Sequence, residues 1–175
     1  MELPYTICFC CHREQVLLLY RTFPPNAQLW NGLGGKIETG ETPLASVQRE
    51  VQEEAGIDLR EAPSLFFAGI VTWGLVGHEP AQGMYAFIAH LSAQQAKQAY
   101  SQQTPEGLLT WKSLAWACHP NNLEVVSNIP QFLPSMLEAQ YPSEYFYEYT
   151  REDLSVTSFQ RLVIRPLPAH LKHAW

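Results

Sequence analysis

Three glutamates within five residues form the part of the chain best suited to chemistry. Glu50, Glu53 and Glu54 are spaced three and four positions apart, and on a helix such positions lie on one face. At about 100° per residue, Glu53 and Glu54 fall roughly 60° and 40° on either side of Glu50. Like charges at this spacing repel one another, and a divalent cation would remove the repulsion. Because the ligands are all oxygens, the pattern favours Mg²⁺ or Mn²⁺.

The neighbouring residues predict the helix that carries this acidic group. Thr42 can cap it and Pro43 suits its first position, while Gly56 suits the left-handed residue that ends it. We therefore expect a helix over Pro43–Ala55, with an apolar stripe for packing made of Leu44, Val47, Val51 and Ala55. Upstream, a loop could bring its backbone close to a phosphate or a metal at three glycines, Gly32, Gly34 and Gly35.

The spacing of these residues resembles the signature of the Nudix hydrolases. Gly35 is followed after five residues by Glu41, and after seven more by the run Arg49-Glu50-Val51-x-Glu53-Glu54-x-Gly56-Ile57. Every position that the signature specifies is filled. A solvated acidic helix face is the other interpretation, but it needs no fixed glycines, cap and arginine together. The resemblance implies an α/β/α sandwich with a mixed β-sheet, and metal-assisted hydrolysis of a nucleoside diphosphate linked to another group.

The resemblance also implies roles for the residues of the signature. Glu53 and Glu54 would bind metal together with the backbone carbonyl of Gly34, with two or more Mg²⁺ or Mn²⁺ ions as cofactor. Glu50 would bind a metal or take the proton from water, and both roles stay open. Arg49 would orient Glu50 through a charge-assisted hydrogen bond, form a surface ion pair with Glu53, or do both.

Two further acidic residues outside the helix receive roles from the same resemblance. Glu41 is expected to be structural and to fix the loop. Glu106 is the best candidate for an additional metal ligand, because Glu106-Gly107-x-x-x-Trp111 resembles a segment of related enzymes in which such a glutamate precedes a strand tryptophan. The alternative for Glu106 is a solvated loop glutamate, and Glu79 is a weaker candidate in another loop.

The segment before the signature bears on the substrate. The stretch Trp30-Asn31-Gly32-Leu33-Gly34-Gly35-Lys36 resembles the MutT-like enzymes that remove oxidised purine nucleoside triphosphates such as 8-oxo-dGTP. In those enzymes the asparagine that matches Asn31 hydrogen-bonds the base, and an amide offers both a donor and an acceptor. Gly35 and Lys36 belong to the same substrate-binding stretch. Asn31 could instead be a turn residue, Trp30 is expected in the core, and Phe23 would stack on the base or anchor its loop.

A second resemblance to the oxidised-purine enzymes lies near residue 128. Those enzymes read the base with an acidic residue at about this place, whereas this chain has Asn128. An amide can donate as a protonated acid does, so Asn128 either contacts the base or caps a helix. Branches that act on ADP-ribose or dinucleoside polyphosphates tend to carry a proline or a tyrosine past the signature, where this chain has Thr72-Trp73-Gly74-Leu75.

These observations predict a pyrophosphohydrolase that converts nucleoside triphosphates into a monophosphate and pyrophosphate. Hydrolysis of another nucleoside diphosphate derivative, or a nucleotide-binding module without turnover, are the alternatives. The 175 residues suit one domain over 1–175. A net charge of −6 gives no support for binding polymeric nucleic acid, and with neither a membrane span nor a signal-peptide pattern we expect a cytoplasmic protein. Monomer and homodimer both remain open.

The remaining elements follow from hydrophobic alternation and turn residues. Strands are expected over residues 5–11, 16–20, 64–73, 84–91, 108–114, 144–150 and 156–164, the first two as a hairpin and the last two as a pair. A loop is expected over 23–30, a helix over 130–140, helix or loop over 94–103, and a C-terminal tail over 166–175. Cys8, Cys10 and Cys11 are interpreted as buried residues of the first strand and not as a zinc site.

Overall fold

The computed structural model of the chain describes residues 2–80, 82–149 and 159–171. Its strands are β1 (Glu2–His12), β2 (Gln15–Arg21), β3 (Trp30–Asn31), β4 (Ser64–Leu75), β5 (Gln82–His90), β6 (Gln102–Gln103), β7 (Gly107–Ser113), β8 (Ser143–Tyr149) and β9 (Phe159–Pro166). Its helices are α1 (Pro43–Ala55), α2 (Ala93–Gln98), α3 (Leu114–Ala117) and α4 (Ile129–Glu138), with short 3-10 turns η1 (Leu59–Glu61) and η3 (Ala169–Leu171).

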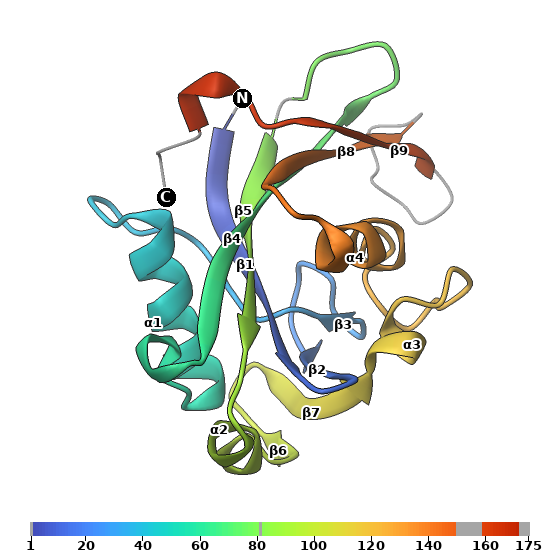
Figure 1. Cartoon of the computed structure of the whole chain (residues 1–175). Helices are drawn as coiled ribbons and strands as arrows, with labels where there is room; N and C mark the ends of the chain where they lie inside the picture. Colours follow the sequence, from blue (N-terminus) through green and yellow to red (C-terminus); the bar gives the residue numbers. More distant parts are fainter. Residues whose placement is uncertain (1, 81, 150–158, 172–175) are drawn as a thin grey trace.

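All the strands belong to one mixed sheet, which has helices on both faces (Figure 1). The strand order is β6-β7-β2-β1-β5-β4-β8-β9, and β3 pairs with β2 outside this path. β1 runs parallel to β5, and β4 runs parallel to β8, whereas the other pairs are antiparallel. α1 covers one face, and α3 and α4 lie on the other (Figure 1). The expected α/β/α sandwich with a mixed sheet is confirmed.

The signature helix α1 begins and ends at the residues predicted from the sequence. The Thr42 side chain accepts a hydrogen bond from the backbone N–H of Ala45, and Gly56 adopts the left-handed conformation at φ 68°. Val47 and Val51 are fully buried in the core between α1 and the sheet, and burial of such a side chain stabilises the fold by about 1.5–3 kcal/mol. This packing fixes the orientation of α1 and, with it, the adjoining face that carries the acidic residues.

The alternation of β1 divides its side chains between the two cores. Cys8 and Cys10 belong to the core beneath α1, whereas Phe9 and Cys11 belong to the core beneath α4. All three cysteines of this strand are buried, as predicted. β1 therefore joins the two hydrophobic cores at the centre of the sheet.

The sequence prediction is confirmed for the strand pairs at the two ends of the chain and differs from the structure in several shorter elements. The first two strands form the expected hairpin, and β8 and β9 pair as expected, although residues 150 and 156–158 lie outside the described residues. Residues 94–103, for which helix and loop were both expected as alternatives, contain most of α2 and the two-residue strand β6. The expected loop 23–30 ends in β3. α3 was not predicted, because the expected strand 108–114 ends at Ser113 and a helical turn follows.

The helix expected over 130–140 is confirmed, with ends shifted by one and two residues, whereas the expected C-terminal tail is corrected. α4 runs through Pro134 and ends at Glu138. Residues 166–171 are not a free tail, because Pro166 completes β9 and the side chains of Leu167 and Leu171 are buried in the core beneath α1. Residues 172–175 lie outside the described part of the chain.

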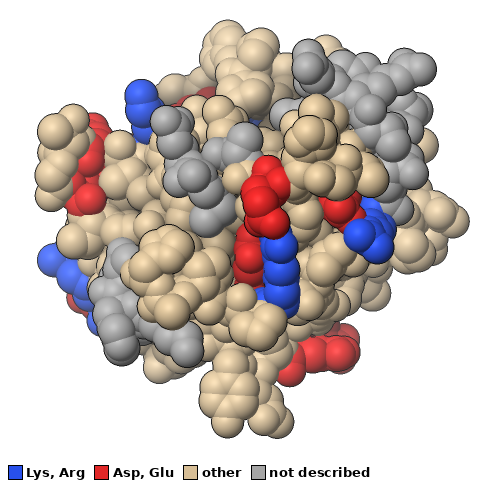
Figure 2. Space-filling view, turned by 90° about the horizontal axis from the view of Figure 1, so that it is seen from above, with Lys and Arg blue, Asp and Glu red and all other residues tan. Residues whose placement is uncertain are grey.

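Acidic and basic side chains lie next to one another at the centre of the face seen in Figure 2. β8 and β9 lie at this end of the molecule (Figure 1), where Arg165 pairs with the buried Glu144 at 3.1 Å and Arg161 pairs with Glu148. Across residues 2–80, 82–149 and 159–171, no helix combines the length and the apolarity needed to cross a membrane.

Candidate active site

The loop that contains Gly32, Gly34 and Gly35, here called the glycine loop, precedes α1 and lies against β1. Thr6 donates its backbone N–H to the carbonyl of Gly35 at 2.8 Å, and Cys8 donates to the carbonyl of Leu33 at 2.6 Å. Gly34 has φ 141°, and a Cβ atom there would lie 2.3 Å from the carbonyl oxygen of Thr6. A side chain at residue 34 would therefore push the loop away from the strand.

The same loop covers two of the signature carboxylates. The backbone N–H of Gly34 donates a hydrogen bond to Glu54 Oε2 at 2.8 Å. A Cβ atom on Gly35 would lie 2.5 Å from Glu50 Oε1. The loop backbone consequently forms a thin wall directly above the acidic face of α1.

Glu54 is the most perturbed of these acids. The residue is only 5% exposed, and its Oε1 atom is buried without a hydrogen-bond partner. The pKa of Glu54 is raised to about 8, first by burial and then by the negative charges of Glu106 and Glu50, while the hydrogen bond from Gly34 opposes the rise. A buried carboxyl with an unused oxygen and acidic neighbours favours a bound cation.

Arg49 joins three acidic residues to the glycine loop. Its Nε and Nη2 atoms donate to the two oxygens of Glu41 at 3.0 and 3.1 Å, and Nη2 also donates to the carbonyl of Lys36. Its Nη1 atom donates to Glu50 Oε1 at 2.9 Å and to Glu53 Oε2 at 3.1 Å. Arg49 thus makes both contacts that the sequence left open.

Glu41 and Glu50 respond differently to this arginine. The hydrogen bond from Arg49 is the largest of the effects that lower the pKa of Glu41, and Glu41 also accepts a bond from the backbone N–H of Glu38. These contacts agree with the expected structural role. The pKa of Glu50 is raised, first by burial, although Arg49 opposes the shift.

Glu106 directly precedes β7 and lies close to the acidic face of α1. Its charge raises the pKa of both Glu50 and Glu54. Its backbone carbonyl accepts a bond from Thr22, and its side chain is half exposed, 3.8 Å from Arg21. The fold therefore brings Glu106 to the signature carboxylates across some 50 residues of sequence.

Glu79, the weaker candidate, lies elsewhere. Its side chain is 91% exposed, and its nearest ion-pair partner is Arg165 of β9 at 3.9 Å. It therefore has no contact with the acidic face of α1 among the described residues.

The donor set fits a hard divalent cation in chemical type but is not assembled as a cluster. In the described part of the chain, no three acidic, histidine or cysteine side chains lie close enough to hold an ion as they stand. Arg49 holds Glu50 and Glu53, whereas Glu54 offers its free Oε1. Because Glu53 is 60% exposed, its carboxylate is free to turn from Arg49 toward an ion.

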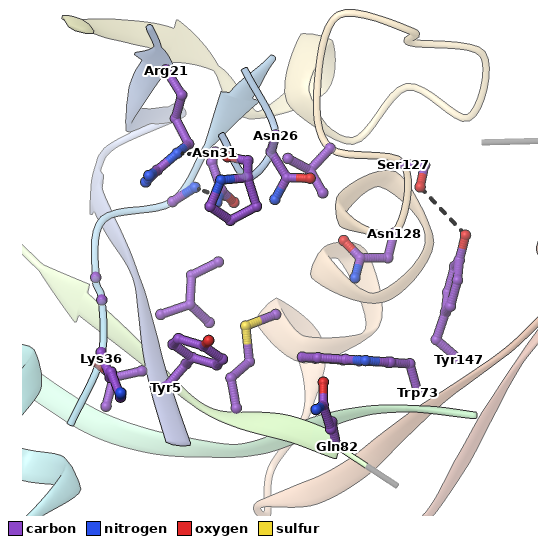
Figure 3. A pocket seen from close by; sticks show the side chains of 18 residues that line it. Tyr5, Arg21, Asn26, Asn31, Lys36, Trp73, Gln82, Ser127, Asn128 and Tyr147 are labelled. Carbon is purple, nitrogen blue, oxygen red and sulfur yellow. Dashed lines mark hydrogen bonds between the residues drawn. The ribbon is translucent and has the colours of Figure 1, made fainter. Parts of the chain in front are cut away.

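A cavity of about 470 Å³ opens on the other side of the glycine loop (Figure 3). Its size is typical of a site for a small organic ligand. Gly34 and Gly35 line it, so their backbone separates the cavity from Glu54 and Glu50. Two cationic side chains, Arg21 and Lys36, belong to its lining.

Two amides predicted to bind the base both line this cavity. Asn31 accepts a hydrogen bond from the backbone N–H of Gly32 through Oδ1 at 3.0 Å. Asn128 precedes α4 but makes no capping hydrogen bond, and its Oδ1 is buried without a partner. Figure 3 shows its amide turned into the cavity. This geometry disagrees with a simple cap role for Asn128.

Phe23 lies outside the cavity lining, and its side chain is 60% exposed. Trp30 is 6% exposed, as expected for a core residue. Sequence reasoning did not find several large side chains that line the cavity, namely Tyr5, Trp73, Met84 and Tyr147. They come from four different strands, and the signal available was only the alternation of each strand.

Comparison of the sequence with protein-family models shows the family of this chain. The family model of the NUDIX domain matches residues 2–116, which is well over half of the chain. The chain belongs to the Nudix family. The signature helix, the glycine loop and Glu106 all lie within the matched part of this Nudix protein.

Individual relatives are more distant. The chain is 31% identical over 85 residues to the mouse oxidized purine nucleoside triphosphate hydrolase, an alignment that covers 49% of this chain and 53% of the mouse protein. This Nudix chain thus matches about half the length of that relative.

Solved structures support the fold. A MutT protein from Bacillus halodurans superposes with a TM-score of 0.69 at 24% identity, covering 94% of this chain and 98% of that protein. Shewanella oneidensis NrtR, solved in complex with a 27mer DNA, gives a TM-score of 0.61 at 17% identity over 77% of this chain and 60% of its own. Because the sequence identities are below 25%, these structural similarities show a shared fold and nothing about a shared activity.

Proposed function

We propose that this protein is a nucleotide pyrophosphohydrolase that depends on Mg²⁺ or Mn²⁺. One observation carries the proposal: the Gly34–Gly35 backbone has an acidic site on one side and, on the other, a cavity lined by the amides of Asn31 and Asn128. A polyphosphate that crosses this loop would have its base in the cavity and its phosphates at the acids. The residues that would hold the metal ions are Glu50, Glu53, Glu54, Glu106 and the carbonyl of Gly34.

The reaction adds water across one phosphorus–oxygen–phosphorus bridge. The water oxygen forms a bond to phosphorus, and the bond from that phosphorus to the bridging oxygen breaks. The products are pyrophosphate and a nucleoside monophosphate. When bound, divalent cations would neutralise the phosphates and lower the pKa of the attacking water. Glu50 would bind metal or accept the proton from water, while Arg49 orients its carboxylate.

The cavity supports a purine as the base. Asn31 and Asn128 each offer an amide with a donor and an acceptor, and the free Oδ1 of Asn128 lacks a partner that a base would supply. Trp73 lies flat along the cavity in Figure 3, as a residue that stacks on a base would. The mouse relative is named for oxidised purine nucleoside triphosphates, and 8-oxo-dGTP is therefore the proposed substrate.

A panel of nucleotides tests both levels of the proposal. With Mg²⁺ or Mn²⁺, we expect pyrophosphate release from nucleoside triphosphates and the highest kcat/KM for 8-oxo-dGTP. E53Q and E54Q should each lower kcat by orders of magnitude while the circular dichroism spectrum stays unchanged. Near-normal rates in both variants would contradict the site, and a preference for undamaged dCTP or for ADP-ribose would contradict the substrate.

Binding without turnover is the second candidate. The NUDIX domain of NrtR has been solved with ADP ribose, and it superposes on this chain with a TM-score of 0.50. Such a module would bind nucleotides in calorimetry and release no product from any member of the panel. The complete set of signature acids in this chain favours turnover.

A further inference from the structure

Two short segments that line the cavity receive little support from regular structure. Asn31 belongs to the two-residue strand β3. Val126, Ser127 and Asn128 belong to residues 118–128, which connect α3 to α4 without forming a helix or strand of their own. Other contacts must therefore fix the amides of Asn31 and Asn128 relative to each other.

Backbone hydrogen bonds join these two segments next to the amides. Trp30 donates its N–H to the carbonyl of Glu124 at 2.8 Å, and Val126 donates its N–H to the carbonyl of Trp30 at 2.9 Å. Trp30 directly precedes Asn31, and Val126 lies two residues before Asn128. Trp30 thus connects the backbone next to Asn31 to the segment that leads to Asn128.

The indole of Trp30 is in turn held by a lysine of β7. Lys112 Nζ lies 4.3 Å from the ring centroid of Trp30 and 4.8 Å from that of Trp116. The two indoles meet edge to face, with centroids 6.4 Å apart. No described carboxylate forms an ion pair with Lys112, so these rings are the partners of its charge.

Asn122 closes the set of contacts. Its Nδ2 donates to the carbonyl of Trp116 at 2.8 Å, and its Oδ1 accepts from the N–H of Glu124 at 2.9 Å. The carbonyl of Glu124 accepts the hydrogen bond from Trp30, whose ring contacts Lys112, so these contacts form a closed ring. We call Lys112, Trp30, Trp116 and Asn122 the aromatic clamp. None of these four residues lines the cavity.

We propose that the aromatic clamp positions Asn31 and Asn128 for the nucleobase, which makes Lys112 and Asn122 positioning residues for base recognition. The inference rests on the proposed function of the cavity. In the described residues, no hydrogen bond or ion pair links the clamp to the signature acids. Loss of the clamp should consequently weaken base binding and leave the hydrolytic step unchanged.

The central variant is K112M, which keeps the aliphatic stem and removes the cation. K112R is the matched control, because a guanidinium also stacks over indoles. K97M, on the exposed α2 helix, controls for the loss of one positive charge. We expect K112M to raise KM for 8-oxo-dGTP, and Kd for 8-oxo-dGMP, by roughly three- to tenfold with kcat within about twofold. K112R and K97M should behave as wild type.

Hydrogen exchange gives a readout that needs no catalysis. Exchange of the Trp30 and Val126 amides should be roughly tenfold faster in K112M than in wild type, and unchanged in K112R. N122A should have the same effects on exchange and on KM. Because the two side chains act on one segment, the double variant should lose less than the product of the two single losses.

The outcomes separate this inference from the proposed function. If wild type binds 8-oxo-dGMP and both K112M and N122A bind it equally well, the positioning role is wrong. Equal losses of kcat and affinity in both variants would also overturn it, because they indicate general damage. If wild type itself binds no purine nucleotide, the proposed base site fails first, and the positioning role fails with it.

Discussion

At the scale of single residues, burial distinguishes Glu54 from the other acids of α1. A carboxyl whose pKa is raised to about 8, first by burial, is mostly protonated near neutral pH, where an exposed glutamate is fully ionised. Its Oε1 has no partner to stabilise the charge. The fold therefore carries an electrostatic cost at this position that a divalent cation would relieve.

This cost predicts that E54Q stabilises the protein in EDTA at high pH. The folded pKa of Glu54 lies above its ordinary value of 4.5, so the folded state holds the proton more tightly than the unfolded state. Wild type should lose stability as the pH rises from about 4.5 to about 8 and then level off. Glutamine does not titrate, and E54Q should be more stable than wild type by a few kcal/mol at about pH 9.

Thermal unfolding at about pH 5 and pH 9 measures the effect. E53Q is the matched control, because Glu53 is 60% exposed and carries no comparable burial cost. Addition of Mg²⁺ at high pH should raise the Tm of wild type and leave that of E54Q unchanged. A Tm for E54Q below that of wild type at pH 9 would show that burial of Glu54 has no such cost.

The sequence predicted which acidic residues lie near one another better than it predicted their surroundings. Spacing predicted that Glu50, Glu53 and Glu54 share a helix face, and the pattern before Trp111 selected Glu106, which the fold brings close to Glu50 and Glu54. The burial of Glu54 and the unpartnered amide of Asn128 depend on neighbours far away in the chain. Such long-range contacts leave no local pattern, which is also why the cavity residues Trp73, Met84 and Tyr147 were missed.

At the scale of elements, α1 and the glycine loop act as one unit through Arg49. The guanidinium forms two hydrogen bonds to Glu41 and one to the carbonyl of Lys36. These bonds tie the loop to the helix with little dependence on the rest of the fold. A planar group with several donors suits this task better than a lysine.

E41Q should therefore destabilise the protein by about 1 kcal/mol near neutral pH. The folded pKa of Glu41 is lowered from 4.5 mainly by Arg49. The contribution of its charge is present above the unfolded pKa and is lost as the pH falls through the lower folded pKa. The difference in free energy of unfolding between wild type and E41Q should thus shrink below about pH 4.

Urea unfolding across this range of pH tests the prediction. E38Q removes the same charge from an exposed position of the same loop and should change stability little. A difference between wild type and E41Q that stays constant from neutral to acidic pH would show that the ion pair with Arg49 contributes nothing.

Elements differed in how well the sequence predicted them. α1 was predicted to the residue, because a cap, a first-turn proline and a terminal glycine specify its limits. β3, β6 and α3 are two to four residues long, and no periodicity can appear over so few positions. Tertiary contacts determine such elements, as the hydrogen bonds of Trp30 with Glu124 and Val126 do for β3.

At the scale of the whole molecule, the sheet separates two cores with different tasks. The core beneath α1 holds the acidic helix in place, and the core beneath α4 supports the wall of the cavity. β8 connects the second core to the cavity, because Tyr145 is fully buried in the core and Tyr147 lines the cavity. Substitutions on this one strand can therefore separate global stability from ligand binding.

Tyr145 offers the clearest case. Its ring packs against Phe132, with centroids 6.3 Å apart, but its hydroxyl is buried without a hydrogen-bond partner. Burial raises the pKa of Tyr145 to about 12, as expected for a phenol removed from water. A buried polar group without a partner costs roughly 1–3 kcal/mol.

Y145F should accordingly raise the free energy of unfolding by about 1 kcal/mol, because it removes the hydroxyl and keeps the ring. Urea unfolding measures the change, and the affinity for nucleotides should stay constant. Y147F is the matched control on the same strand: the hydroxyl of Tyr147 lies 3.3 Å from Ser127 Oγ, so its removal should give no gain in stability and should alter ligand affinity. If Y145F is instead less stable than wild type, the Tyr145 hydroxyl has a partner, and the core beneath α4 is more polar than its side chains indicate.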